Sequence, residues 1–83
     1  MEEKEAVDVL HDILAECAGL LLDHCVELSQ VQSPHPVTLT DYNHYEVRIK
    51  CMVDDDLRIC LSRVVNKHKL LMRQEGNQII LYR

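Results

Sequence analysis

Residues 4–31 read KEAVDVLHDILAECAGLLLDHCVELSQV, and their apolar side chains recur at alternating steps of three and four. This spacing predicts one long helix over about 4–31. The seam that it forms consists of Val7, Leu10, Leu14, Cys17, Leu21, His24, Leu28 and Val31. Further apolar residues widen the seam on both sides, so only a narrow acidic stripe is left for solvent. Such a helix needs several neighbours to cover its apolar surface.

Three strands are predicted after this helix. Two prolines in SPHP at 33–36 stop the helix, because proline cannot continue one and restricts the residue before it. Alternation of apolar and polar residues predicts strands at about 37–40 and 45–53. The closing run QIILY predicts a further strand at about 78–82.

A second helix is predicted over about 56–74, where apolar residues again fall on one face. Gly76 or Asn77 is expected to end it in the left-handed conformation. The order α-β-β-α-β predicts a single α+β domain over 1–83. It is expected to be a two-layer sandwich with both helices on one face of a three-stranded sheet. The open edges of so thin a sheet invite pairing with another chain.

The net charge of −5 hides a division along the chain. Residues 1–31 carry eight acidic groups and one lysine, which gives −7, and residues 57–83 carry six basic groups and one glutamate, which gives +5. The two segments are expected to attract each other, within one fold or across a dimer. The alternative is that the basic segment binds nucleic acid.

The four cysteines are predicted to be reduced and to pack as small apolar side chains. Residues 1–5, MEEKE, lack the basic start and apolar run of a secretory signal. No CxxC occurs, and the positions 17, 25, 51 and 60 fit no common zinc pattern. We therefore expect a reducing, cytoplasmic location and no metal or cofactor. A metal site assembled from distant elements is the alternative that stays open.

The aspartates at 54–56 allow two interpretations. Clustered carboxylates are ligands for Mg²⁺ or Ca²⁺. The favoured prediction is that Asp54 or Asp55 caps the second helix. The sequence contains no nucleophile motif. It has no glycine-rich phosphate loop, since the chain has only two glycines. No apolar run is long enough for a membrane span. The sequence therefore predicts no enzymatic activity.

These features predict a protein-interaction module: a homodimer, or a small subunit or adaptor of a larger assembly. The partner would contact the apolar face of the first helix. The expected interface residues are Leu14, Cys17, Leu21, His24 and Leu28.

The alternative is a nucleic-acid-binding protein that uses its basic second helix and open sheet face. The expected contacts are Arg58, Arg63, Lys67, Lys69 and Arg73. The near absence of aromatic rings for base stacking counts against it.

Overall fold

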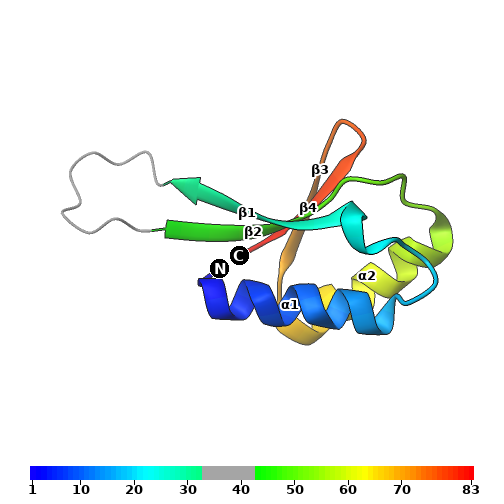
Figure 1. Ribbon diagram of the computed structural model, residues 1–83, viewed down its shortest axis with the longest axis horizontal. Coiled ribbons are helices and arrows are strands. Elements are labelled where there is room, and N and C mark those ends of the chain that lie inside the picture. The colour runs from blue at the N-terminus through cyan, green and yellow to red at the C-terminus, as the bar shows by residue number, and fades with distance from the viewer. Residues whose placement is uncertain (33–42) are drawn as a thin grey trace.

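The computed structural model describes residues 1–32 and 43–83. Within these ranges lie two helices and a short 3₁₀ turn, α1 (Glu3–Glu16), α2 (Asp55–His68) and η1 (Asp23–Cys25) (Figure 1). The strands are β1 (Val26–Gln32), β2 (Asn43–Ile49), β3 (Leu71–Glu75) and β4 (Gln78–Tyr82). The predicted α+β class with two helices is confirmed.

The strands form one antiparallel sheet in the order β1-β2-β4-β3. β1 and β2 pair over the full length of both strands, and β4 joins the other side of β2 through the pairs Val47↔Leu81 and Ile49↔Ile79. β3 pairs with β4 along its whole length. The strands β1 and β3 are therefore the two edges of the sheet.

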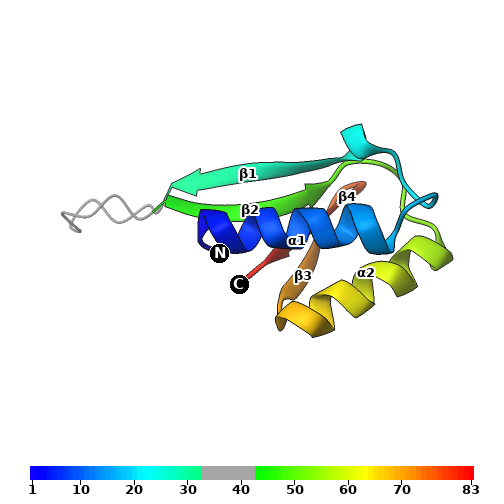
Figure 2. The same cartoon turned by 60° about the horizontal axis from the view of Figure 1, so that its bottom comes forward.

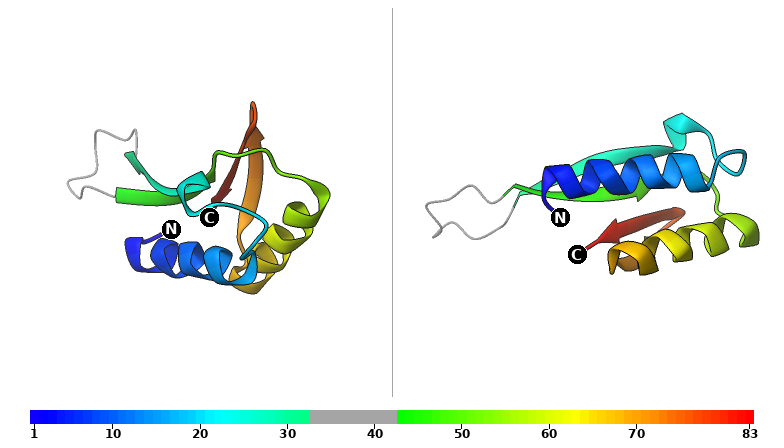
Figure 3. Two further views of the ribbon diagram at one scale, coloured as in Figure 1. Left: turned by 45° about the vertical axis from the view of Figure 1, so that its right-hand side comes forward. Right: turned by 90° about the horizontal axis from the view of Figure 1, so that it is seen from below.

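Both helices lie on the same side of the sheet, which gives two layers (Figures 2 and 3). α1 runs along β1 and β2, and α2 lies beside the β3–β4 half. The core fills the space between the layers. Its fully or almost fully buried side chains are Ala6, Val9, Ile13, Leu57, Cys60, Leu61, Val64, Val47, Ile49, Ile79 and Leu81.

The predicted helix over 4–31 is wrong beyond Glu16. Gly19 has a φ of 85°, a conformation outside the right-handed helix, and η1 then leads into β1. In β1, Val26 and Leu28 face the helices, while Glu27 and Ser29 lie on the other face. The apolar residues of this stretch fit the spacing of a helix, but their alternation with polar residues within VELSQVQ fits a half-buried strand equally well. The sheet consequently has four strands, not three.

The second helix ends at His68 and not at 74. Lys69 adopts the left-handed conformation with a φ of 55°, and the backbone N–H of Leu70 donates to the carbonyl of Val65. This is a Schellman ending, with Leu70 buried behind it. The predicted role of Gly76 as a helix cap is also wrong, because its φ of 59° serves the two-residue turn between β3 and β4.

The other boundaries differ less. The strand predicted at 45–53 is β2 and ends at Ile49, and the strand predicted at 78–82 is β4, with the bounds expected. The strand predicted at 37–40 lies outside the described residues. Asp54 caps α2, as predicted, because its carboxylate accepts a hydrogen bond from the Leu57 N–H at 2.8 Å.

Candidate functional site

Two disulfides tie together the end of the molecule where α1 finishes and α2 begins. Cys17, directly after α1, is bonded to Cys60 of α2, with a Cα–Cα distance of 5.9 Å. Cys25, at the end of η1, is bonded to Cys51 after β2, with a Cα–Cα distance of 5.2 Å. All four cysteines are thereby paired.

These bonds overturn the expectation of reduced cysteines in a reducing cytoplasm. Structural disulfides are characteristic of oxidising environments, so the structure indicates such an environment for this protein. The cause of the error is geometric. Each bond joins segments far apart in the sequence, and cysteine spacing alone cannot show which pairs approach each other.

The residues expected to form an interface do not share a helical face. Leu14, Leu21 and Leu28 are partly buried and pack against the core, and Cys17 is fully buried. Only His24 is exposed. The apolar surplus of the opening segment is therefore largely covered by its own sheet and by α2.

Exposed apolar side chains lie elsewhere, close to the disulfides. Leu22 is 64% exposed and Met52 92% exposed, and Leu20 and Ile59 are also exposed. Each of these four lies within three residues of a disulfide cysteine. The disulfide-bonded end thus carries apolar surface that the fold leaves open to solvent.

An open pocket of about 340 Å³ adjoins this end. The pair Gln74↔Ile79 of the β3–β4 hairpin lines it from the helix-facing side of the sheet, and the segment after β2 and the first turn of α2 line it from elsewhere. The lining residues are Lys50, Met52, Val53, Arg58, Gln74, Asn77 and Ile79. The pocket therefore combines two cations and two amides with three apolar side chains.

The two cations of the pocket differ in their partners. Lys50 Nζ lies 3.0 Å from a carboxylate oxygen of Glu27, so part of its charge is already balanced. Arg58 has no ion-pair partner within 1–32 and 43–83. Arg58 is therefore the group at this pocket that is best placed to attract a carboxylate.

The residues expected to contact nucleic acid are not all available for it. Lys67 lies 3.1 Å from Asp12, and Arg73 forms ion pairs with Glu46 and Glu75. The remaining three, Arg58, Arg63 and Lys69, are exposed. The acidic and basic segments attract each other within one fold, through Asp12 and Lys67 and through Glu5 and Arg83.

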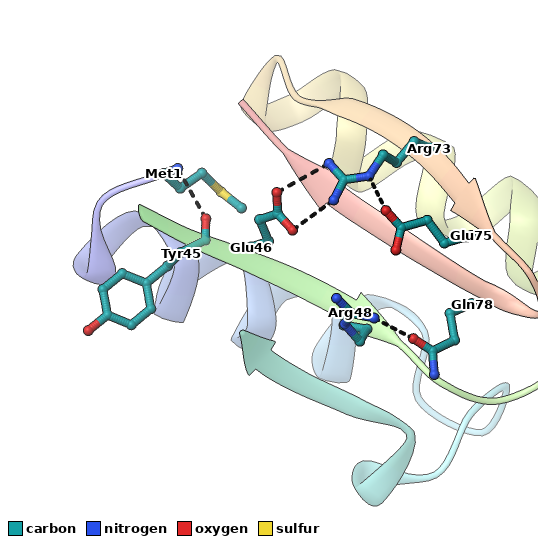
Figure 4. A network of polar contacts seen from close by, with 7 residues as sticks. All are labelled: Met1, Tyr45, Glu46, Arg48, Arg73, Glu75 and Gln78. Atoms are coloured by element: carbon teal, nitrogen blue, oxygen red, sulfur yellow. Dashed lines mark hydrogen bonds and ion pairs between the residues drawn. The ribbon is translucent and has the colours of Figure 1, made fainter. Parts of the chain in front are cut away.

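The sheet face opposite the helices carries a polar network (Figure 4). The guanidinium of Arg73 donates two hydrogen bonds to Glu46, at 3.2 and 3.1 Å, and one to Glu75 at 2.9 Å, which raises its pKa above the ordinary arginine value. It also lies 4.8 Å from the centre of the Tyr82 ring. On the same face, Arg48 donates to Gln78. Ile80, which pairs with both arginines across the sheet, is fully buried beside them.

This network binds the three strands β2, β4 and β3 to one another on the outer face. The charge of Arg73 is already balanced by Glu46 and Glu75, and on this network only Arg48, whose partner Gln78 is a neutral amide, keeps an unbalanced charge for a polyanion. The open sheet face is thus a worse candidate for phosphate contacts than its sequence suggested.

Sequence reasoning does not bring the pocket residues Lys50, Met52, Gln74 and Asn77 together. They come from the end of a strand and from a hairpin whose first strand, β3, lies largely within the segment predicted to be helical. The sequence signal for that hairpin was the Gly76–Asn77 pair between two apolar runs, a common turn pattern.

No protein-family model, curated protein or solved structure matches this chain. Among the described residues, neither helix has the length and apolar character needed to cross a membrane.

Proposed function

We propose that this chain is a non-enzymatic protein-binding module, stabilised by disulfides, whose pocket receives a segment of a partner protein. The observation that carries the proposal is that one pocket combines open apolar surface with Arg58, which has no ion-pair partner among the residues that the structure describes. A carboxylate of the partner would lie against Arg58, and an adjacent aliphatic side chain would pack on Met52 and Val53.

Two physical arguments support a peptide of this chemistry. An arginine near the surface attracts a carboxylate with a geometry that suits bidentate hydrogen bonding. An exposed methionine adapts its shape to different apolar partners because its chain is unbranched and polarizable. The amides of Gln74 and Asn77 supply a donor and an acceptor each for the backbone of the bound segment.

The test is a titration of the ¹⁵N-labelled, oxidised chain with short capped peptides that contain Asp-Leu, Lys-Leu or Asp-Ser. The proposal expects saturable shifts of the pocket amides with Asp-Leu, and at least about tenfold weaker binding of the other two, which corresponds to about 1.4 kcal/mol. Equal binding of the Lys-Leu peptide would overturn it.

Arg58→Glu supplies the decisive variant, and Arg63→Glu supplies its matched control. Both arginines are exposed on α2 and lack an ion-pair partner in the described ranges, but only Arg58 lines the pocket. Binding of the Asp-Leu peptide should be lost in Arg58→Glu and retained in Arg63→Glu. Equal losses in the two variants would mean that general charge attraction, and not the pocket, governs binding.

Light scattering on the purified chain identifies the source of the bound segment. A dimer that Arg58→Glu dissociates would mean that a second copy provides its own acidic segment. A monomer that binds the Asp-Leu peptide means that the partner is another protein.

A further inference from the structure

The second disulfide lies beside a histidine. The Nδ1 or Nε2 atom of His24 and the sulfur atoms of Cys25 and Cys51 all lie within 4.8 Å of one another. Two thiolates and one imidazole are a donor set that soft and borderline metal ions prefer. We propose that reduction of the Cys25–Cys51 disulfide creates a metal site for Zn²⁺ or Cu⁺, with His24 as the third ligand.

The distances suit tetrahedral coordination. Two thiolates on one zinc ion, each at about 2.3 Å from the metal, lie about 3.8 Å apart. The bonded sulfurs of Cys25 and Cys51 therefore have to move apart by roughly 1.8 Å after reduction, and their Cα atoms are 5.2 Å apart. A ring nitrogen of His24 lies within 4.8 Å of both sulfurs, where a tetrahedral site needs about 3.6 Å, so the exposed side chain has to approach by roughly 1 Å to complete the set of three donors.

The local backbone fixes these donors. His24 and Cys25 belong to η1, and the Cys25 N–H donates to the carbonyl of Leu22 at 2.9 Å. The Cys25 carbonyl accepts a hydrogen bond from the Lys50 N–H at 2.7 Å, which joins η1 to the residue before Cys51. These two bonds are independent of the disulfide and would keep the ligands close when it opens.

The charge around the site permits a cation. Lys50 is the nearest basic neighbour of Cys51 in the sequence, and its ammonium group is paired with Glu27 at 3.0 Å. Asp23, directly before His24, adds a negative charge to η1. Since the described residues supply three protein ligands, a fourth position of a tetrahedral site is left for water or for a ligand from another molecule.

The two disulfides differ in accessibility. Cys17 and Cys60 are both buried in the core, whereas Cys51 is partly exposed. A thiolate attacks a disulfide through an accessible sulfur. A dithiol reductant should therefore open Cys25–Cys51 first and leave Cys17–Cys60 intact.

The metal site forms in two steps, reduction and metal binding. The dithiol reductant supplies two electrons and two protons, becomes a disulfide itself, and converts Cys25–Cys51 into two thiols. Zn²⁺ then displaces both thiol protons, which pass to the buffer, and binds the lone pair of the neutral His24 imidazole.

The experiment uses the full chain, treated with limiting dithiol and desalted without oxygen. Titration with Co²⁺, followed by competition with Zn²⁺, reports thiolate coordination through sulfur-to-cobalt charge-transfer absorbance. We expect this absorbance in the mildly reduced chain and none in the oxidised chain. Its absence from the mildly reduced chain would overturn the proposal.

Variants and alkylation mapping assign the ligands. His24→Ala should weaken metal binding by at least roughly tenfold, the lower end of the cost of losing even an outer-shell partner. The control His11→Ala, at an exposed position of α1, should bind as the unaltered chain does. Unchanged affinity in His24→Ala would exclude the histidine from the site.

Mass spectrometry after alkylation gives a readout that needs no variant. In the mildly reduced chain, Zn²⁺ should protect Cys25 and Cys51 from alkylation, with Cys17 and Cys60 still joined. Protection of Cys17 and Cys60 instead would place the metal at the wrong pair. Because no peptide is present in these measurements, their outcome does not depend on the proposed peptide pocket.

Discussion

Asp12 joins the two helices through a single carboxylate. Its Oδ2 atom lies 2.6 Å from Nε2 of His68 and 3.1 Å from Nζ of Lys67. The hydrogen bonds from His68 and then from Lys67 hold the pKa of Asp12 below its ordinary value. Asp12, which the sequence pattern places on the solvent-exposed acidic stripe, thus forms a contact between α1 and the end of α2.

Asp12→Asn should lower the free energy of unfolding at pH 7 by about 1 kcal/mol, since the pair is partly open to solvent. A carboxyl group with a lowered folded pKa stabilises the fold above its unfolded pKa of about 3.9. This stabilisation is lost as the pH falls through the folded pKa. The difference between the variant and the unaltered chain should therefore shrink toward pH 2.

Urea unfolding at pH 7 and at pH 2 measures both effects. Asp8→Asn is the matched control, because Asp8 is exposed on the same helix and has no ion pair in the described part of the chain. A difference of the same size at the two pH values would mean that the Asp12 carboxylate contributes no charge-dependent stability.

The C-terminus of α2 is set by the backbone conformation of one residue, Lys69. Lys69 takes a left-handed φ of 55° that costs a side-chain-bearing residue about 1 kcal/mol relative to glycine. The cost is tolerated because the turn places Leu70 in the core and sends the chain into β3.

Lys69→Gly should accordingly raise the free energy of unfolding by up to about 1 kcal/mol. Arg63→Gly, in the exposed middle of the same helix, should lower it by about 0.8 kcal/mol, because glycine is a poor helix former there. Urea midpoints for both variants test the prediction. Destabilisation by Lys69→Gly would show that the lysine side chain contributes more than its backbone conformation costs.

The elements that the sequence predicts correctly are those whose apolar side chains follow a single repeat, either that of a strand or that of a helix. Val47 and Ile49 alternate with Glu46 and Arg48, and the cap at Asp54 precedes an apolar helical face, so β2 and the start of α2 follow from the sequence. Around Leu28 and Met72, in contrast, the apolar spacing fits a helix and a strand alike. Pairing with β2 and β4 decides these segments, and that pairing is not visible in local spacing.

The candidate sites were still less predictable. The pocket takes its lining from a strand end, a helix start and a hairpin, and the His24 cluster takes its ligands from η1 and the segment after β2. Sequence reasoning left open a metal site from distant elements but could not assign its ligands. Such sites depend on contacts between segments more than twenty residues apart.

The two disulfides hold distant parts of the chain together. They join residues 43 and 26 positions apart, so each closes a large part of an 83-residue chain. Few aromatic side chains are available to enlarge the core, since the chain has three tyrosines and neither tryptophan nor phenylalanine. Covalent closure therefore supplies stability that a small aliphatic core does not.

Removing either bond should destabilise the fold through the entropy of the unfolded chain. Loop closure predicts losses of about 4 kcal/mol for Cys17→Ala/Cys60→Ala and about 3.5 kcal/mol for Cys25→Ala/Cys51→Ala. Loss of the Cys17–Cys60 bond should lower the free energy of unfolding by more than loop closure alone predicts. Its sulfur atoms also fill part of the core, whereas Cys51 is partly exposed.

Urea unfolding of both double variants measures these losses, and a non-reducing peptide map of the unaltered chain establishes which cysteines are bonded. Free thiols in the chain isolated under oxidising conditions, or a larger loss from the Cys25–Cys51 variant, would contradict this order. In the expected case, mild reduction opens the bond whose loss the fold tolerates better, which is the condition that a reversible site at Cys25 and Cys51 requires.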